Sequence, residues 1–274
     1  MSELHWRRVH LTDTTLEVAV HGTGDPVVVV QTAATADEFV PFATRPELDG
    51  HRLVLCHRRG YCGSDPVRGP GSVDRDVRDC RHLMEALGIG RAHVVGGSYG
   101  GAVALQLAAD APEHVHTLTL IEPPPVFTAA GGEFLAATDR LLEDYREHGA
   151  APTLDRFLGR VMGPDWRAEL DRRLPGGSAQ AERDADTLFG TDLPALRAWC
   201  FAAEDAGRIT APVLYVGGTE SGPWFEEVRR EVLRRFPQAQ DVAIDGADHS
   251  LPITHPAEVA AAVGAFLREH PLGA

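Results

Sequence analysis

Residues 94–101 read Val-Val-Gly-Gly-Ser-Tyr-Gly-Gly, and this stretch decides the fold. The apolar residues 92–95 before it are typical of a short buried strand, and the small residues 102–111 after it are typical of a helix. A strand that turns abruptly into a helix leaves no room for side chains beside the turn, which explains Gly96 and Gly100. The turn exposes the hydroxyl of Ser98, and the N-terminus of the helix points at it. Ser98 is therefore a candidate nucleophile.

Strand-like and helix-like segments alternate along most of the chain. Apolar or alternating stretches predict strands over residues 16–21, 27–30, 52–56, 92–95, 115–121, 213–216 and 240–244. Helical spacing predicts helices over 72–87, with Ser72 as the N-cap, and over 256–268. Such alternation predicts an α/β protein with a mostly parallel central sheet and helices on both faces.

Residues 126–208 interrupt the alternation, because they show helical patterns and no convincing strand. A long helical insertion between two core strands is expected to cover one end of the sheet as a lid. We therefore predict a core formed by residues 1–125 and 209–274 and a helical cap formed by residues 126–208.

These features resemble the α/β-hydrolase family over nearly the whole chain. Residues 94–101 look like the family's nucleophile elbow. Arg59-Gly60-Tyr61-Cys62-Gly63-Ser64 resembles the loop commonly written RGxGxS, with Cys62 where glycine is usual. The insertion lies where the family places its cap domain. The resemblance implies the α/β-hydrolase fold, with a nucleophile, an acid and a histidine in that chain order.

The base that this order implies is His249, which lies between the last predicted strand and the last predicted helix. Two carboxylates compete to orient it. Glu122 directly follows the strand 115–121, and haloalkane dehalogenases place the acid at the end of this strand. Glu220 follows the strand 213–216, where the family usually has it. Both strand ends suit the role, so both residues stay candidates.

The expected oxyanion hole uses two backbone N–H groups. One belongs to Tyr99, which follows the nucleophile. The second belongs to Ala33 in the loop after the strand 27–30, where relatives commonly read His-Gly-x and this chain reads Gln31-Thr32-Ala33-Ala34. Each such donor typically stabilises the transition state by about 3 kcal/mol. For the substrate pocket we expect side chains from this loop and from the cap: Gln31, Thr32, Phe157, Met162, Trp166 and Trp199.

A serine nucleophile with a histidine base supports acyl transfer through an acyl-enzyme. We expect hydrolysis of an ester, thioester or lactone bond in a small to medium, largely apolar substrate. A C–C bond hydrolase or a biosynthetic lyase or cyclase is an alternative on the same scaffold. A receptor that binds a small ligand without turnover is a second alternative, from outside the enzymes.

The charge and composition of the chain limit the classes of molecule that it is expected to bind. The 274 residues include 40 acidic and 26 basic side chains, a net charge of -14 that disfavours nucleic acid and anionic membranes. No metal-binding or phosphate-loop spacing is found, so we expect no metal and no cofactor. The first residues lack the apolar segment that is typical of a signal peptide, and no apolar run is long enough to span a bilayer, so we expect a cytoplasmic protein. The expected partner is a small-molecule substrate, and the sequence leaves room for a homodimer.

Overall fold

The structure is a computed structural model that describes residues 4–273. Eight strands form one sheet in the order β1-β2-β4-β3-β5-β6-β7-β8. Strand β2 pairs antiparallel with β1 and β4, and all the other neighbours are parallel. The strands are β1 (Trp6–His10), β2 (Thr15–His21), β3 (Asp25–Val30), β4 (His51–His57), β5 (Ala92–Gly97), β6 (Val115–Ile121), β7 (Val213–Gly218) and β8 (Gln240–Ile244).

The prediction of a mostly parallel sheet is confirmed, and β5 lies at its centre between β3 and β6. Residues 27–30 of β3 form a continuous apolar run because both faces of the strand are covered, and all six residues of β5 are buried. The sequence reading missed β1. Three of its five residues are exposed, so this edge strand lacks the apolar pattern that reveals a buried one.

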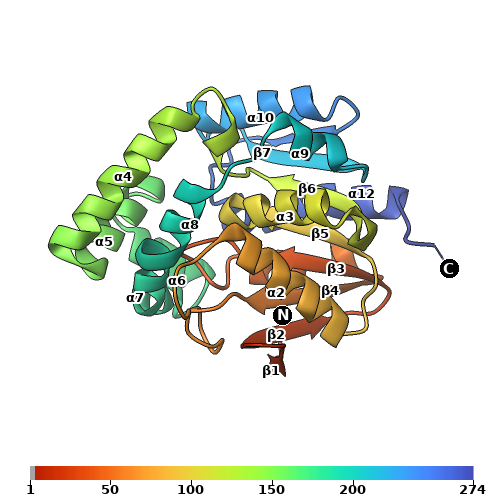
Figure 1. Cartoon of the computed structure of the whole chain (residues 1–274), viewed down its shortest axis with the longest axis horizontal. Helices are drawn as coiled ribbons and strands as arrows, with labels where there is room; N and C mark the ends of the chain where they lie inside the picture. Colours follow the sequence, from red (N-terminus) through yellow and green to blue (C-terminus); the bar gives the residue numbers. More distant parts are fainter. Residues whose placement is uncertain (1–3, 274) are drawn as a thin grey trace.

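Helices cover both faces of the sheet (Figure 1). One face packs against α2 (Val73–Ala86), α3 (Ser98–Asp110) and α10 (Pro223–Arg235). The other packs against α1 (Val40–Ala43), α11 (Leu251–Thr254) and α12 (Pro256–Glu269). Two short 3-10 turns, η1 (Pro46–Leu48) and η2 (Pro112–His114), precede β4 and β6. Ser72 caps α2 as predicted, since its hydroxyl accepts the N–H of Arg75 at 3.1 Å.

Residues 122–212, all of them described, form no strand between β6 and β7. Their helices α4 to α7 form the green group at one end of the sheet in Figure 1. Most of these helices share a separate apolar cluster around Trp166, Leu170 and Phe189. The division into core and cap at residues 126 and 208 stays a prediction. The elements are η3 (Pro125–Phe127), α4 (Gly131–His148), α5 (Ala150–Val161), α6 (Trp166–Arg173), α7 (Gly177–Thr187), the π-helical turn η4 (Leu188–Asp192), α8 (Leu193–Ala198) and α9 (Ala203–Arg208).

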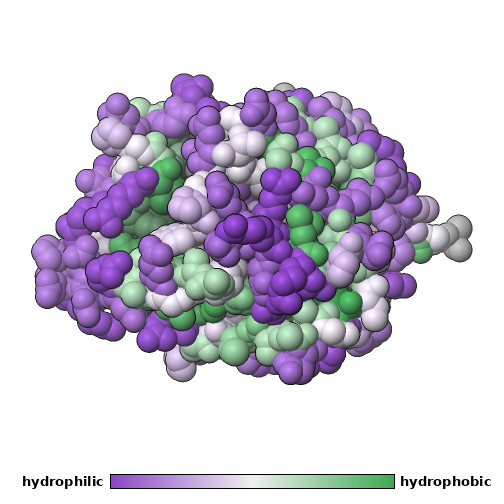
Figure 2. All heavy atoms as spheres, turned by 90° about the horizontal axis from the view of Figure 1, so that it is seen from above, coloured by the Kyte–Doolittle hydropathy of each residue, from purple (hydrophilic) through white to green (hydrophobic). Residues whose placement is uncertain are grey.

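The face of the molecule shown in Figure 2 is mainly polar. On the face in Figure 2, hydrophilic residues predominate and hydrophobic ones form small separate patches. Within residues 4–273, no helix combines the length and the apolar character needed to cross a bilayer. The cytoplasmic location and the homodimer stay predictions.

Candidate active site

Ser98 occupies the sharp turn between β5 and α3. Its backbone has a φ of +48°, a left-handed conformation that is strained for a residue with a side chain. The flanking glycines are required by close approach. A Cβ on Gly96 would lie 2.3 Å from the carbonyl oxygen of Gly100, and a Cβ on Gly100 would lie 2.4 Å from that of Val30. The turn thus depends on contacts with β3 as well as on its own residues.

His249 lies in the loop between β8 and α11 and bridges two side chains from other strand ends. Its Nε2 is 3.1 Å from the hydroxyl of Ser98, and its Nδ1 is 2.7 Å from a carboxylate oxygen of Glu122. With the Nδ1 proton donated to Glu122, Nε2 is free to accept the proton of Ser98. Phe225, at the start of α10, stacks on the imidazole with the ring centres 4.0 Å apart. The ring is therefore held at both nitrogens and on one face.

Glu122 is fully buried and follows β6 directly, with a φ of +44°. Its second carboxylate oxygen accepts the N–H of Gly218 at 2.8 Å, and its own N–H donates to the carbonyl of Val216 at 3.2 Å. The end of β7 therefore holds Glu122 toward His249. Glu220 is exposed, and its side chain makes no hydrogen bond to any described residue. Of the two candidate acids, the structure brings only Glu122 to His249.

The surroundings of His249 favour its charged form. Burial by itself lowers the pKa of this imidazole, but the hydrogen bond and the negative charge of Glu122 outweigh that effect. The pKa of His249 is consequently raised above its ordinary value of 6.5. An imidazole with a raised pKa is a stronger base once it is deprotonated, and the imidazolium that forms after proton transfer is stabilised.

The two residues expected to supply oxyanion donors lie beside Ser98. Ala33 and Tyr99 both line the cavity that contains Ser98. Among the described residues neither N–H has a hydrogen-bond partner. Tyr99 belongs to the first turn of α3, where N–H groups have no acceptor within the helix. Both amides are thus available to an oxygen atom bound beside Ser98.

The cavity has a volume of about 790 Å³ and is walled by the core and the helical insertion together. Thr32, Phe157 and Met162 lie on its wall, whereas the other three expected pocket residues do not. Gln31 is turned into the protein, where its side-chain oxygen accepts the backbone N–H of Arg58. Trp166 is buried in the insertion's own apolar cluster, and Trp199 packs against the core and donates to Gln106. The prediction that these three residues line the pocket was therefore wrong. For the two tryptophans the reason is that large apolar residues more often pack into a core.

The sequence reading missed much of the wall. Apolar side chains on one face of α4 and α5, and a pair at the start of α10, could have been found from their helical spacing: Phe134, Leu141, Leu158, Val161, Trp224 and Phe225.

No sequence pattern indicated that Glu38 is part of the wall. This wall residue is only 8% exposed and accepts a hydrogen bond from Thr35 at 2.9 Å. Burial raises the pKa of Glu38 to about 7.

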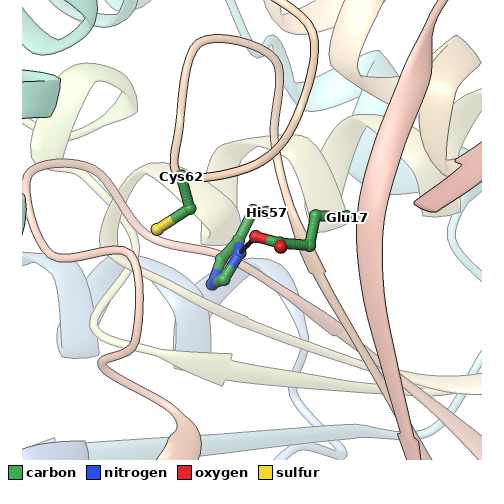
Figure 3. A group of neighbouring side chains, drawn as sticks. All are labelled: Glu17, His57 and Cys62. Atoms are coloured by element: carbon green, nitrogen blue, oxygen red, sulfur yellow. Dashed lines mark hydrogen bonds and ion pairs between the residues drawn. The ribbon is translucent and has the colours of Figure 1, made fainter. Parts of the chain in front are cut away.

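Two clusters of side chains have the composition of a metal site, within the part of the chain that the structure describes. In the first, Glu17, His57 and Cys62 converge (Figure 3). Both ring nitrogens of His57 already contact carboxylates, Glu17 at 2.9 Å and Asp37 at 3.1 Å. Burial opposes the charge, yet these two bonds and the neighbouring Cys62 raise the pKa of His57 to about 11. A ring protonated at both nitrogens has no lone pair for a metal.

The second cluster contains Asp13, Asp79 and His82. Its two carboxylates both bind the guanidinium of Arg59, at 2.6 to 2.7 Å. In both clusters a cation of the protein thus occupies the place where a metal ion would neutralise the carboxylates. The prediction that the protein needs no metal stays untested.

A serine, a histidine and a glutamate in hydrogen-bonded series at the carboxyl edge of a mostly parallel sheet define a hydrolase-type site of the α/β class. The family model described as "alpha/beta hydrolase fold" matches residues 18–256. The chain therefore belongs to the α/β-hydrolase family.

Several known proteins similar to this chain are named as hydrolases. Lipase LipV of Mycobacterium tuberculosis is 31% identical, in an alignment that covers 95% of this chain and 96% of LipV. The 2-hydroxy-6-oxo-6-phenylhexa-2,4-dienoate hydrolase of Burkholderia cepacia is 30% identical, over 62% of this chain and 61% of its own length. Some other matches cover a smaller part of the relative, 42% in one case and 26% in another. A solved thermophilic esterase from Thermogutta terrifontis has a TM-score of 0.80 at 21% identity, covering 97% of this chain and 99% of that one.

Proposed function

We propose that the protein is a serine hydrolase that cleaves an ester, thioester or lactone bond through an acyl-enzyme on Ser98. The observation that carries this proposal is the unbroken series from Glu122 through His249 to Ser98, opening into a cavity beside two unpaired amides. The lipase and esterase among the similar proteins support the same class of bond.

The reaction begins when His249 Nε2 accepts the hydroxyl proton as Ser98 attacks the acyl carbonyl carbon. Glu122 stabilises the imidazolium, and the amides of Ala33 and Tyr99 donate to the oxyanion of the tetrahedral intermediate. The intermediate collapses as His249 gives its proton to the leaving alkoxide or thiolate. Water, deprotonated by His249, then attacks the acyl-enzyme, and a second collapse releases the acid and restores Ser98.

The cavity wall supports a largely apolar substrate without negative charge. Its apolar side chains come from both the core and the insertion. Apart from His249 and Tyr99, its ionisable lining residues are six acids and two arginines: Glu38, Glu143, Asp144, Glu147, Glu220, Asp248, Arg140 and Arg160. Both arginines are exposed, as are Glu143, Glu147 and Glu220, so these five residues lie at the mouth of the cavity. The three acids that lie deeper are Glu38, Asp144 and Asp248. A substrate carboxylate would meet mostly like charge.

C–C bond hydrolysis is the second candidate, because a similar protein is named as a dienoate hydrolase. Its substrate carries a carboxylate, which the acidic lining disfavours. Rates on a panel of neutral aryl esters and on a dienoate of this kind separate the two functions. An esterase should turn over several of the esters and leave the dienoate unchanged.

Intact-mass labelling with a fluorophosphonate tests the proposed nucleophile. The wild type should gain one adduct, Ser98→Ala none, and His249→Ala should react far more slowly because its serine lacks a base. Hydrolysis of p-nitrophenyl butyrate by the same three proteins should follow the same order. An adduct that persists on Ser98→Ala would contradict the assignment.

A further inference from the structure

A buried ionic network lies behind the loop that carries Ala33. Arg58 follows β4 and is only 5% exposed, yet its guanidinium is fully engaged. It binds both carboxylate oxygens of Asp192, at 2.5 and 2.9 Å, and one of Asp76 at 3.1 Å. Asp192 ends the π-helical turn η4 of the helical insertion and is fully buried. The insertion therefore supplies a counterion to a cation of the core.

The same guanidinium holds the backbone of residues 31–34. It donates to the carbonyl oxygen of Gln31 at 3.2 Å and to that of Thr32 at 3.0 Å. The Thr32 carbonyl and the Ala33 N–H belong to one peptide group. In a trans peptide these two groups point in opposite directions. Because Arg58 binds the carbonyl from the protein interior, the N–H is directed away from it, toward the cavity.

Tyr61 and Tyr99 connect the network to both expected oxyanion donors. The hydroxyl of Tyr61 donates to Asp192 at 2.6 Å and accepts the N–H of Ala34 at 3.3 Å. Ala34 has a φ of +68°, so this loop is kept in a conformation that it would not choose by itself. The hydroxyl of Tyr99 donates to Asp76 at 2.8 Å, and its ring lies 4.2 Å from the Arg58 guanidinium.

We propose that Arg58, together with Asp192 of the insertion, is a positioning pair that fixes the orientation of the Thr32–Ala33 peptide and thereby forms the second oxyanion donor. A peptide flip would replace the Ala33 N–H in the cavity by a carbonyl oxygen, which repels the oxyanion. The helical insertion is thus part of the machinery that stabilises the transition state, in addition to its role as a wall. This inference rests on the proposed function.

Asp192→Asn is a suitable test, because it leaves Arg58 paired with Asp76 and creates no uncompensated buried charge. Asp79→Asn is the matched control. Asp79 forms a buried bidentate pair with the neighbouring Arg59, which keeps Asp13 as its second partner, and the Asp79 side chain makes no hydrogen bond to residues 31–34. Tyr61→Phe is a second test that removes one hydroxyl and no charge.

The measurements are kcat and KM for p-nitrophenyl butyrate, the melting temperature, and Ki for a trifluoromethyl ketone. This ketone mimics the tetrahedral intermediate when Ser98 adds to it. Asp192→Asn should lower kcat by about 10- to 100-fold and raise Ki by a similar factor, with KM nearly unchanged, as expected for a weakened oxyanion donor. Tyr61→Phe should show the same pattern to a smaller degree. Asp79→Asn should lower the melting temperature and leave kcat and Ki close to wild type.

The inference is overturned if Asp192→Asn and Tyr61→Phe lower the melting temperature but leave kcat and Ki at the wild-type values. The network would then have a structural role only. If the wild-type protein shows no turnover, or turnover that does not depend on Ser98, the proposed function itself is overturned, and the positioning role with it. The Ser98→Ala protein, assayed in the same series, distinguishes these two results.

Discussion

At the scale of single residues, the raised pKa of His249 predicts how activity depends on pH. Only the neutral imidazole accepts the Ser98 proton, so kcat/KM should rise with pH and level off above a pKa higher than 6.5. Glu122 is the largest of the influences that raise this pKa, ahead of Glu38 and Asp248. Glu122→Gln should therefore move the rising limb to lower pH and reduce kcat by about three to four orders of magnitude. The pH–rate profiles of the two proteins check this.

Glu220→Gln is the matched control for that experiment. Glu220 lies at the end of the neighbouring strand but makes no hydrogen bond to His249 in the described chain. The rising limb of this variant should stay at the wild-type position. A limb that moves in Glu220→Gln and stays in place in Glu122→Gln would instead assign the acid to Glu220.

Glu38 provides a second prediction at this scale, which concerns stability. Burial raises its pKa from 4.5 to about 7, so the folded state binds the proton more tightly than the unfolded state. This contribution is complete below pH 4.5 and is lost as pH rises to about 7. Relative to Glu38→Gln, the wild type should lose about 3 kcal/mol of unfolding free energy across that range. Urea denaturation of both proteins at pH 4.5, 6 and 8 measures the difference, and a constant difference would contradict it.

At the scale of elements, the β5–α3 turn depends on a close approach to β3. Gly100→Ala would place a Cβ 2.4 Å from the Val30 carbonyl oxygen, within the strand that leads to the Ala33 loop. We expect the free energy of unfolding to fall by about 3 kcal/mol or more, and the activity to be lost, because the backbone must move to make room for the Cβ.

Gly159→Ala is the control for Gly100→Ala. Gly159 lies inside α5, and a Cβ at this position would meet no neighbouring atom within 4 Å. This change should raise the unfolding free energy by about 0.5 to 1 kcal/mol, since alanine favours the helix. Chemical denaturation of both variants gives the comparison. Equal effects would show that the elbow tolerates a side chain.

At the scale of the whole molecule, the net charge of -14 and the acidic cavity lining predict discrimination by substrate charge. In dilute buffer, kcat/KM for p-nitrophenyl hemisuccinate should be at least about 10-fold lower than for neutral p-nitrophenyl butyrate. The difference should narrow in 1 M salt, where the screening length falls from about 10 Å to about 3 Å. A difference that does not respond to salt would indicate a steric cause.

Sequence patterns alone predict part of this fold and part of the candidate site. The strand–turn–helix around Ser98, the alternation of elements and the place of His249 in the chain order are local or sequential features, and they could be predicted. Seven strands and the cap's helical character followed from them. The polar edge strand β1 could not, because its exposed residues carry no apolar pattern.

By itself, the sequence determined that a serine lies at a strand-to-helix turn and that a histidine follows the last strand. It left Glu122 and Glu220 open, because β6 and β7 are neighbours that end at the same edge, and only the direction of the side chains separates them. The left-handed backbone of Glu122 and its bond to Gly218 decide that direction. The pairing of Arg58 with Asp192, 134 residues away, likewise exists only in the folded chain. Contacts between distant segments depend on packing, which local sequence patterns do not encode.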